Sequence, residues 1–489
     1  MKNILKWILI QMIVVLILGA CSDAFFDEIP SDRVTADESY KSMAEAALAC
    51  YAPLAILRDV APQMVFACDL MSDMTVVTDN ADLNWQEIND HNLSADNPYL
   101  DPSVLYQVIV NANESLLYID SIMNYDQDMT ELYAKILKGN LIGIRSWAYF
   151  TIARLYGEVA YIKDNLPQLA GEDLVYVPRK DILDTLVNNL LPYLDIDYVD
   201  IGNLAMYNKA LLGEIYLEKQ DYNNAATYLE MAIEGFENIE SIYKVMSSDY
   251  GKDGWQDIFI NSEYNTTEVM IAVPFSFTDQ QPNPIEFWYG YEQEYVAKPT
   301  DFIVNLFNSQ TPLKGKDIGD QYRGLGISYD TIAGNTFVNK YNLNKGVLYS
   351  SDIILYRAAD IHLLFAEALN RMGQTDIALA ILGDGYNEFD GWARNAGIRG
   401  RAYLVPYTRK DIPSGVDVTN YVEDLIVKER AMELAFEGKR WFDLMRVARR
   451  RGTGYLADKV AAKYSDSNLA NKIKEQLKDE KNWYIPFRK

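Results

Sequence analysis

The chain has 489 residues, with 45 Lys or Arg against 70 Asp or Glu, so its formal net charge at pH 7 is −25. This acidity argues against nucleic acid or an anionic membrane surface as a binding partner. The length also exceeds that of an ordinary single domain.

The first 21 residues have the pattern of an export signal. Lys2 and Lys6 form a basic start, an apolar stretch follows over residues 8–18, and small residues immediately precede Cys21. This arrangement resembles a lipoprotein signal, so we predict that residues 1–20 are removed and that Cys21 carries a lipid anchor. The apolar stretch is shorter than the ~20 residues that span a bilayer. Loss of the two lysines leaves the mature chain with a net charge of −27.

The segment after Cys21 is expected to be irregular before the helices begin. Residues 21–39 form an acidic tether, and an amphipathic helix is predicted from Glu38 to Leu57. Residues 78–102 are rich in Asp and Asn and end in a Pro-containing stretch, so we predict a long polar loop there. This loop carries Trp85, His91 and Tyr99.

Cys50 and Cys68 are the cysteines that remain besides Cys21. Outside the cytoplasm a disulfide between them is permitted, and two separate buried thiols are the alternative. Neither cysteine has a metal-ligand companion nearby, so the sequence indicates no metal site at either position.

Helical periodicity dominates the chain and predicts four helical hairpins. Residues 207–237 form the clearest one, because small and large residues recur at tetratricopeptide spacing and let two antiparallel helices approach. The residues at that spacing are Gly213, Tyr216, Tyr222, Ala225, Leu229 and Ala232. A second copy spans about 356–386, and weaker pairs occupy 103–156 and 419–450. The predicted fold class is therefore mostly α, with a tetratricopeptide-like scaffold of helical hairpins.

A segment of different composition separates the two clear repeats. Residues 239–350 contain five prolines, many Gly, Asn and Tyr, and short β-like runs such as Val269–Val273. We predict a large irregular insert with short β-strands at about 239–350, between helical scaffold at about 40–238 and 351–489. Long loops on a rigid scaffold are where binding residues usually lie.

Near the C-terminus stands the charged stretch ERAMELAFEGKRWFDLMR. Arg430, Glu433, Glu437 and Arg440 follow one another at steps of three, four and three, which predicts a shared helix face with Arg430–Glu433 and Glu437–Arg440 ion pairs. Gly438 lies within this pattern, where glycine costs about 1 kcal/mol relative to alanine. It therefore indicates a kink or a close backbone approach.

Several stretches together resemble the SusD/RagB family, the surface nutrient-binding lipoproteins of Bacteroidetes outer membranes. The charged stretch is similar to that family's C-terminal signature, and other stretches follow the family's order along the chain. These are Ile144–Gly157, Tyr356–Leu369 and Asn395–Arg401. Trp483–Pro486 lies where members end in a short Pro-Ile-Pro stretch, from which Phe487 departs. The resemblance covers the whole chain and assigns residues 40–489 to one SusD-like domain.

The resemblance implies a binding protein on the cell surface. It implies capture of oligosaccharides, or of peptides as in some members, and delivery to a SusC-like TonB-dependent transporter in the outer membrane. A tetratricopeptide scaffold that binds only proteins is the alternative. No enzyme or cofactor is expected, because His91 and His362 belong to no metal or catalytic motif and no nucleotide-binding motif is present. The many carboxylates still permit a glycosidase-type pair.

The resemblance also indicates where a ligand binds, since family members use aromatic residues from an N-terminal loop and from the insert. Flat aromatic rings cover the apolar face of a sugar, whereas carboxylates and amides bind its hydroxyl groups. The aromatic candidates are Trp85, Trp288, Tyr289 and Tyr291, and the polar candidates are Asp82, Asn84 and Glu292. The alternative is that these rings pack the insert or contact the transporter. The net charge disfavours acidic glycans and acidic peptides.

Overall fold

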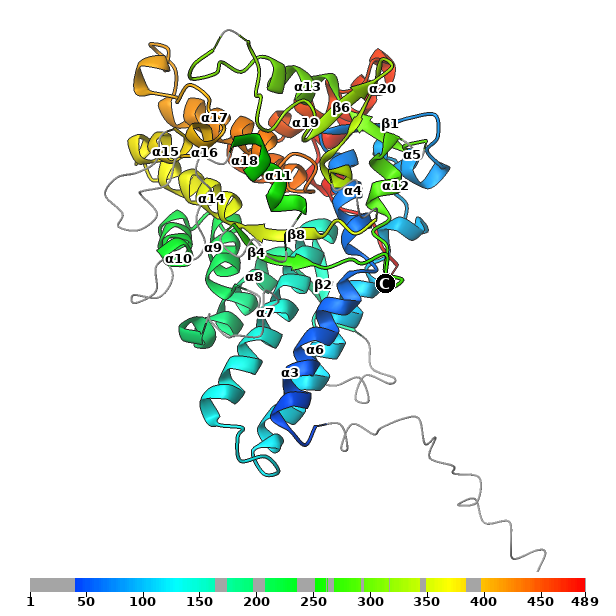
Figure 1. Ribbon diagram of the computed structural model, residues 1–489, viewed down its shortest axis with the longest axis vertical. Helices are drawn as coiled ribbons and strands as arrows, with labels where there is room; N and C mark the ends of the chain where they lie inside the picture. The colour runs from blue at the N-terminus through cyan, green and yellow to red at the C-terminus, as the bar shows by residue number, and fades with distance from the viewer. Residues whose placement is uncertain are drawn as a thin grey trace, which may run out of the picture.

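The computed structural model shows a mainly helical protein, and the predicted fold class is confirmed (Figure 1). It describes residues 40–162, 174–196, 207–234, 251–260, 262, 268–291, 294–315, 317–343, 349–383 and 397–488. Cys21, the predicted signal and the predicted tether lie outside these ranges. Among the described helices, none combines the length and the apolar character needed to cross a membrane.

Three long helices form an arm that extends away from the rest of the molecule (Figure 1). They are α3 (Met43–Leu57), α6 (Ser103–Ile122) and α7 (Glu131–Tyr156). Ser42 begins α3, because its hydroxyl accepts the Glu45 N–H at 3.2 Å while the Glu45 carboxylate accepts the Ser42 N–H at 2.8 Å. The facing sides of the three helices bury a small core of their own, which includes Ala46, Cys50, Ile119, Ile122, Leu137 and Leu141.

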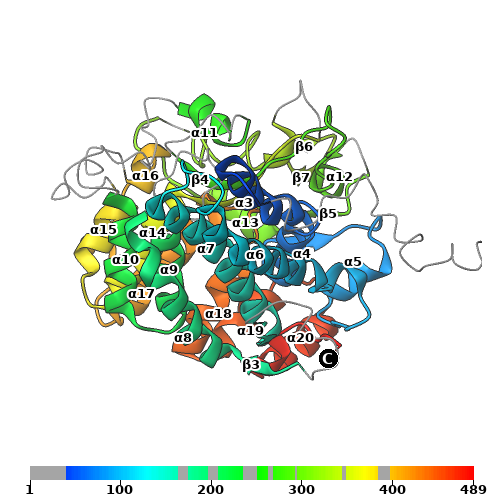
Figure 2. The ribbon, with the colours of Figure 1, turned by 90° about the horizontal axis from the view of Figure 1, so that it is seen from below.

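The predicted helical hairpins are confirmed, and two of them lie side by side (Figures 1 and 2). Their helices are α9 (Asn208–Glu218), α10 (Tyr222–Glu234), α14 (Ala358–Arg371) and α15 (Thr375–Leu382). Helix α10 packs on both α9 and α14, so the two repeats are neighbours although the insert separates them in sequence. A Cβ on Gly213 would lie 2.6 Å from Leu229 Cγ, which explains why the crossing of α9 and α10 needs glycine.

Apart from two helices near the C-terminus that are described below, nine further helices lie in the described chain, and three of them, α11 to α13, lie within the predicted insert. They are α4 (Ala61–Met71), α5 (Leu83–Asn89), α8 (Arg179–Leu190), α11 (Gly251–Ile260), α12 (Ile285–Tyr289), α13 (Asp301–Asn308), α16 (Ile398–Arg401), α19 (Gly454–Ala461) and α20 (Ser467–Leu477). Short 3-10 segments are η2 (Pro98–Leu100), η4 (Leu191–Ile196), η7 (Lys340–Asn342), η9 (Arg409–Asp411) and η10 (Glu480–Trp483). The insert is therefore partly helical as well as partly extended.

The strands of the described chain pair as four antiparallel two-stranded sheets. The pairs are β1 (Thr75–Val77) with β5 (Ala297–Pro299), β2 (Glu158–Ala160) with β3 (Tyr176–Pro178), β4 (Val269–Val273) with β8 (Ile353–Arg357), and β6 (Tyr329–Ile332) with β7 (Asn335–Val338). The β-like run predicted at Val269–Val273 is confirmed as β4. Because β8 leads directly into α14, the β4–β8 pair fixes the insert to the scaffold.

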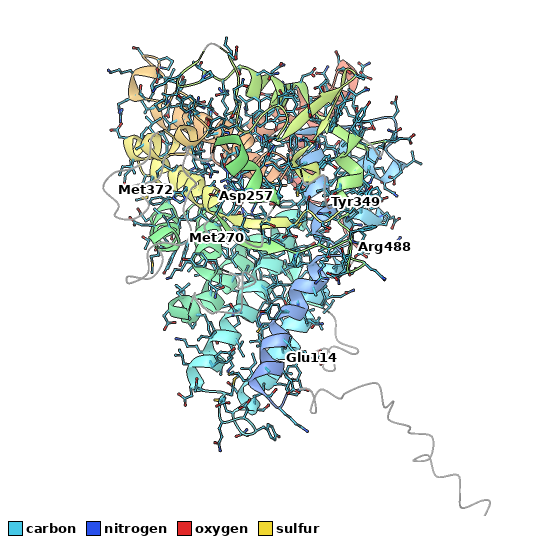
Figure 3. All side chains as sticks on the ribbon, in the orientation of Figure 1. Glu114, Asp257, Met270, Tyr349, Met372 and Arg488 are labelled. Carbon is cyan, nitrogen blue, oxygen red and sulfur yellow. The ribbon has the colours of Figure 1, made fainter. Side chains whose placement is uncertain are left out.

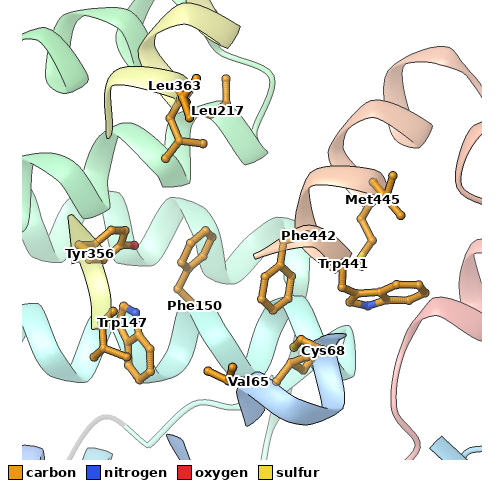
Figure 4. Close-up of a cluster of buried hydrophobic side chains, with 14 of the residues drawn as sticks. Val65, Cys68, Trp147, Phe150, Leu217, Tyr356, Leu363, Trp441, Phe442 and Met445 are labelled. Atoms are coloured by element: carbon orange, nitrogen blue, oxygen red, sulfur yellow. The ribbon is translucent and has the colours of Figure 1, made fainter. Parts of the chain in front are cut away.

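One hydrophobic core joins the scaffold and the insert, with members from Leu54 to Ile485. Figure 4 shows part of it, in which Val65 and Cys68 of α4 lie beside Trp147 and Phe150 of α7, and Trp441 and Phe442 lie near Cys68. Residues of the insert such as Ile271, Ile303 and Phe307 belong to the same cluster. The insert and the scaffold therefore fold as one body.

Cys50 and Cys68 are free, buried thiols and do not form a disulfide. Burial raises the pKa of Cys50 to about 12 and also raises the pKa of Cys68. The alternative of two separate thiols, which the sequence left open, is therefore the one observed.

The polar loop predicted at 78–102 is wrong in part, because it contains helix α5. Asp82 begins this helix, since its carboxylate accepts the Trp85 N–H at 3.0 Å. Trp85 and Ile88, three residues apart, are buried where α5 packs against α4. The Asp- and Asn-rich surroundings masked the single apolar face of this short helix.

The signature stretch is not one helix. Helix α17 (Val418–Glu433) ends within the stretch, α18 (Arg440–Arg451) begins within it, and a turn joins the two. Phe436 and Gly438 have left-handed backbone conformations in that turn, with φ of 63° and 71°. The prediction of a kink or close approach at Gly438 is confirmed, because a Cβ there would lie 2.9 Å from the Cα of Val65.

The Arg430–Glu433 and Glu437–Arg440 ion pairs predicted within that stretch are also wrong, because these side chains pair with residues further away in the sequence. Arg430 binds Asp443 at 2.8 Å, and Arg440 binds Asp73 at 2.7 Å. Glu433 and Glu437 belong to a connected set of ten buried charges, which we call the ion cluster. Its members are Arg323, Lys340, Arg357, Arg399, Arg401, Glu268, Asp320, Glu429, Glu433 and Glu437. The cluster joins the insert, β8, α16 and α17.

Candidate functional site

Two segments far apart in sequence converge on the side of the molecule where α5 and α12 lie (Figures 1 and 2). Strand β1 pairs with β5, with Thr75 opposite Pro299. Beyond the strands, the Thr78 N–H donates to the Val296 carbonyl at 2.8 Å, and the Thr78 hydroxyl donates to the Tyr295 carbonyl at 2.6 Å. This pairing holds the predicted N-terminal loop against the insert, so candidate residues from both segments meet.

An aromatic group marks the point of convergence. The rings of Trp85 and Trp288 lie with their centroids 5.1 Å apart, and the Tyr99 ring stacks on Trp85 at 4.0 Å. The Tyr99 hydroxyl donates a hydrogen bond to Asp82 at 2.6 Å. Burial and the neighbouring Asp82 carboxylate raise the pKa of Tyr99 to about 12. Trp288 and Tyr99 are half-buried and Asp82 is exposed, so this group reaches the surface.

Two of the predicted aromatic residues do not reach the surface. Trp85 is 2% exposed and packs against Phe66, and Tyr289 is 0% exposed. Successive residues of a helix point about 100° apart, so α12 cannot turn Trp288 and Tyr289 to the same side. Neither Trp85 nor Tyr289 is therefore offered to a ligand at the surface. The Trp85 ring packs against Trp288, whereas Tyr289 and Trp288 both pack against Phe66.

The other predicted residues have separate surroundings. Tyr291 is half-buried and packs against Phe337 at 5.2 Å, in a different aromatic group. Asn84 is half-buried, and its carbonyl accepts a hydrogen bond from the Asn97 side chain at 2.9 Å. Glu292 lies outside the described residues. Tyr99, which was not among the predicted site residues, completes the aromatic group around Trp85. The spacing of residues in the sequence does not indicate that Tyr99 lies near Trp288.

Tyr289 attaches α12 to a buried carboxylate on α4. Its hydroxyl donates to Asp69 Oδ2 at 3.0 Å, and the Gly438 N–H donates to Asp69 Oδ1 at 3.2 Å. Asp69 is 1% exposed, and no ion pair reaches it from the described part of the chain. Burial raises the pKa of Asp69 to about 7, an effect that the two hydrogen bonds and the more distant Lys340 only partly offset.

The raised pKa of Asp69 predicts a loss of stability as the pH rises. An unfolded chain releases this proton near pH 4, whereas the folded chain keeps it up to about pH 7. Folding therefore takes up a proton between these values, and the free energy of unfolding falls by up to about 1.4 kcal/mol per pH unit across that window. Asp69→Asn keeps the hydrogen-bonding positions and should remove this contribution. Urea denaturation at pH 5 and pH 7.5 compares the two proteins, and equal losses in both would contradict the assignment.

The converged surface presents aromatic rings beside a carboxylate. Trp288 and Tyr99 present parts of flat rings, and Asp82 presents a carboxylate acceptor beside them. Over the ranges that the structure describes, no three His, Cys, Asp or Glu side chains are grouped so that they could hold a metal ion.

Sequence comparisons relate the chain to one family. Residues 246–488 match the sequence profile of the SusD family. The chain is 24% identical over 485 residues to the SusD-like protein P38 of Formosa agariphila, with 88% of each chain covered. It is 22% identical to a SusD-like protein of Bacteroides ovatus, with 95% of this chain and 86% of that one covered.

Solved structures with the same architecture include a SusD superfamily protein of Bacteroides vulgatus. Its TM-score is 0.71 at 18% identity, with 91% of this chain and 96% of that chain covered. A laminarin-binding SusD-like protein gives a TM-score of 0.60 at 17% identity, with 90% and 98% covered. These likenesses establish a shared fold.

Proposed function

Because this chain belongs to the SusD/RagB family, we propose that it is a cell-surface lipoprotein that binds oligosaccharides. It passes them, without covalent change, to a SusC-like TonB-dependent transporter in the outer membrane. One protein of the same fold is named as laminarin-binding, which supports carbohydrate as the class of ligand.

The observation that carries the proposal is the convergence of α5 and α12. The Trp288 ring, backed by Trp85 and flanked by Tyr99, provides an apolar face for a pyranose ring. Asp82 accepts a hydrogen bond from Tyr99 and has further lone pairs for sugar hydroxyl groups. The formal net charge of −25 favours a neutral glycan over an acidic one.

The anchor part of the proposal rests on the N-terminal sequence. Cys21 carries the lipid, and residues 21–39 connect it to the chain at Tyr40. Tyr40 lies at the free end of the arm formed by α3, α6 and α7, because its ring stacks on Tyr118 near the end of α6 and the Met43 N–H donates to Asp126 just beyond α6.

Substitution of Trp288 by Ala is expected to weaken oligosaccharide binding at least tenfold, about 1.4 kcal/mol. The reason is that a central aromatic ring usually supplies a large share of the binding free energy of such a site. Calorimetric titration of the full-length protein in detergent first identifies a ligand from a panel of plant, host and microbial oligosaccharides and mixed peptides. The same titration then compares the variant with the parent protein.

Tyr125→Ala is the matched control, because Tyr125 is 66% exposed in the turn between α6 and α7. It should bind as the parent protein does. Thermal melting of both variants checks that the packing of Trp288 against Phe66 is not needed for folding. Unchanged affinity in Trp288→Ala would remove this residue from the site, heat with peptides alone would change the ligand class, and no heat at all would favour a protein-binding scaffold.

A further inference from the structure

A second aromatic group lies on the other flank of α12. Phe287 belongs to α12, Phe277 follows β4, and Tyr349 precedes β8. The Phe287 and Tyr349 rings stack with centroids 4.2 Å apart and planes 2° apart, and the Phe277 ring lies 5.9 Å from Tyr349. Figure 3 labels Tyr349 on the side of the molecule where α12 lies. Residues more than 60 positions apart therefore form one continuous group of rings.

Two of these rings are exposed, and the third, that of Tyr349, is half-buried. Phe277 is 58% exposed and Phe287 is 39% exposed, whereas Trp288 beside them packs against the main core. Single exposed apolar residues are common on protein surfaces, but three neighbouring aromatic rings form a patch. The patch is separate from the Trp288 surface, because Phe287 and Trp288 are consecutive helix residues and point in different directions.

Buried polar groups fix the position of Tyr349. Its φ is 59°, a left-handed conformation that is strained for a residue with a side chain. Its N–H donates to the Glu286 carboxylate, and its carbonyl accepts the Asn283 N–H at 2.7 Å. Glu286 also accepts the Ser351 N–H at 2.9 Å. Asn283 and Glu286 are 0% and 2% exposed, so a strained, half-buried aromatic residue is held by a rigid buried base.

A tight turn fixes Phe277 in the same way. Ser276 and Gln281 exchange two backbone hydrogen bonds of 2.9 and 2.8 Å, and the Phe277 N–H donates to the Ser350 hydroxyl at 3.0 Å. The turn also exposes Asp279 and Gln280 beside the rings. The patch thus combines flat rings on a fixed backbone with a carboxylate and an amide at its edge. Because the backbone is already fixed, little conformational entropy is lost when a ligand binds.

We propose that Phe277, Phe287 and Tyr349 form a second carbohydrate platform, which takes a neutral pyranose ring further along the same oligosaccharide that Trp288 holds. The rings cover the C–H face of the sugar, and Asp279 and Gln280 accept or donate hydrogen bonds at its hydroxyl rim. The ligand class rests on the proposed function, whereas the existence and position of the platform rest on the geometry of the three rings. The two platforms on adjacent flanks of α12 select for chain length.

The test uses neutral oligosaccharides of increasing length, from disaccharide to octasaccharide, of a type that the full-length protein binds. In the parent protein, affinity should rise with length until both platforms are covered. Phe277→Ala and Phe287→Ala should each weaken binding of the longest oligomer at least fivefold and leave the shortest binder unchanged. Trp288→Ala should weaken both. Phe277→Tyr, which keeps a ring, should retain the affinity of the parent protein.

Ile332→Ala is the control, because Ile332 is 45% exposed in the same insert but belongs to strand β6. Parent-like affinity of Phe277→Ala and Phe287→Ala for the longest oligomer would overturn the second platform and leave the Trp288 site standing. If no neutral oligosaccharide of any length binds the parent protein, both the proposed function and this platform are overturned. Because both phenylalanines are exposed, their replacement should leave the melting temperature near that of the parent protein.

Discussion

Glu433→Ala is expected to lower the free energy of unfolding by about 3–5 kcal/mol, the usual effect of breaking a buried ion pair. Glu433 binds Arg323 and Arg357 at 2.8 Å each and also binds Arg401. Burial alone would raise the pKa of Glu433, but the three arginines hold it well below its ordinary range. The ion cluster contains five cations and five carboxylates, so loss of one carboxylate leaves an uncompensated positive charge in the core.

Urea denaturation of the variant and the parent protein measures this loss. Glu433→Gln keeps the side-chain volume, so most of the loss should persist in that variant if the charge balance is the cause. Glu475→Ala removes an exposed pair with Lys478 and should have no measurable effect. A Glu433→Gln protein as stable as the parent would show that the ion cluster does not need the negative charge of Glu433.

Gly438→Ala is expected to lower the free energy of unfolding by about 3 kcal/mol, because two penalties add there. An alanine at φ of 71° has the strain of a left-handed backbone, about 1–2 kcal/mol. Its Cβ would also lie 2.9 Å from Val65 Cα and 3.3 Å from Val65 Cγ2, and overpacking of this kind costs about 1–3 kcal/mol. Chemical denaturation measures the sum.

Gly415→Ala separates the two penalties. Gly415 has φ of 82°, but nothing lies within 4 Å of a Cβ placed there, so only the backbone strain of about 1 kcal/mol is expected. If both substitutions reduce stability equally, the contact with Val65 contributes nothing, and the close approach of α4 to the turn is not what requires glycine.

The features that the sequence predicted correctly all have local signals. Gly213 and Gly438 indicated close approaches, because a position where another segment comes too near for a Cβ atom must itself be glycine. The helical hairpins followed from periodicity within about 30 residues, and β4 followed from an unbroken β-branched and apolar run. Such signals need no knowledge of what lies across the core.

The features that the sequence could not give depend on distant partners. The spacing of Arg440 suggested a pair with Glu437, yet its partner is Asp73, 367 residues away. The sequence predicted Trp85 and Tyr289 as binding residues, because aromatic side chains occur both in buried cores and at binding surfaces. Trp85 is buried because it packs on Phe66 of α4, and Tyr289 is buried because its hydroxyl binds Asp69. The spacing of residues around Trp85 and Tyr289 does not reveal these partners. The patch of Phe277, Phe287 and Tyr349 is missed for the same reason.

The core of the arm and the main core imply an order of assembly for a chain that emerges from its N-terminus. The arm buries residues from Ala46 to Leu141 and is complete once that short stretch has appeared. The main core closes only at the end, when Trp483 is buried and the Ile485 N–H reaches the Leu155 carbonyl at 2.8 Å. Contacts over such separations form slowly. A chain truncated by a few residues at its C-terminus should therefore fold its arm but leave the main core exposed and prone to aggregation.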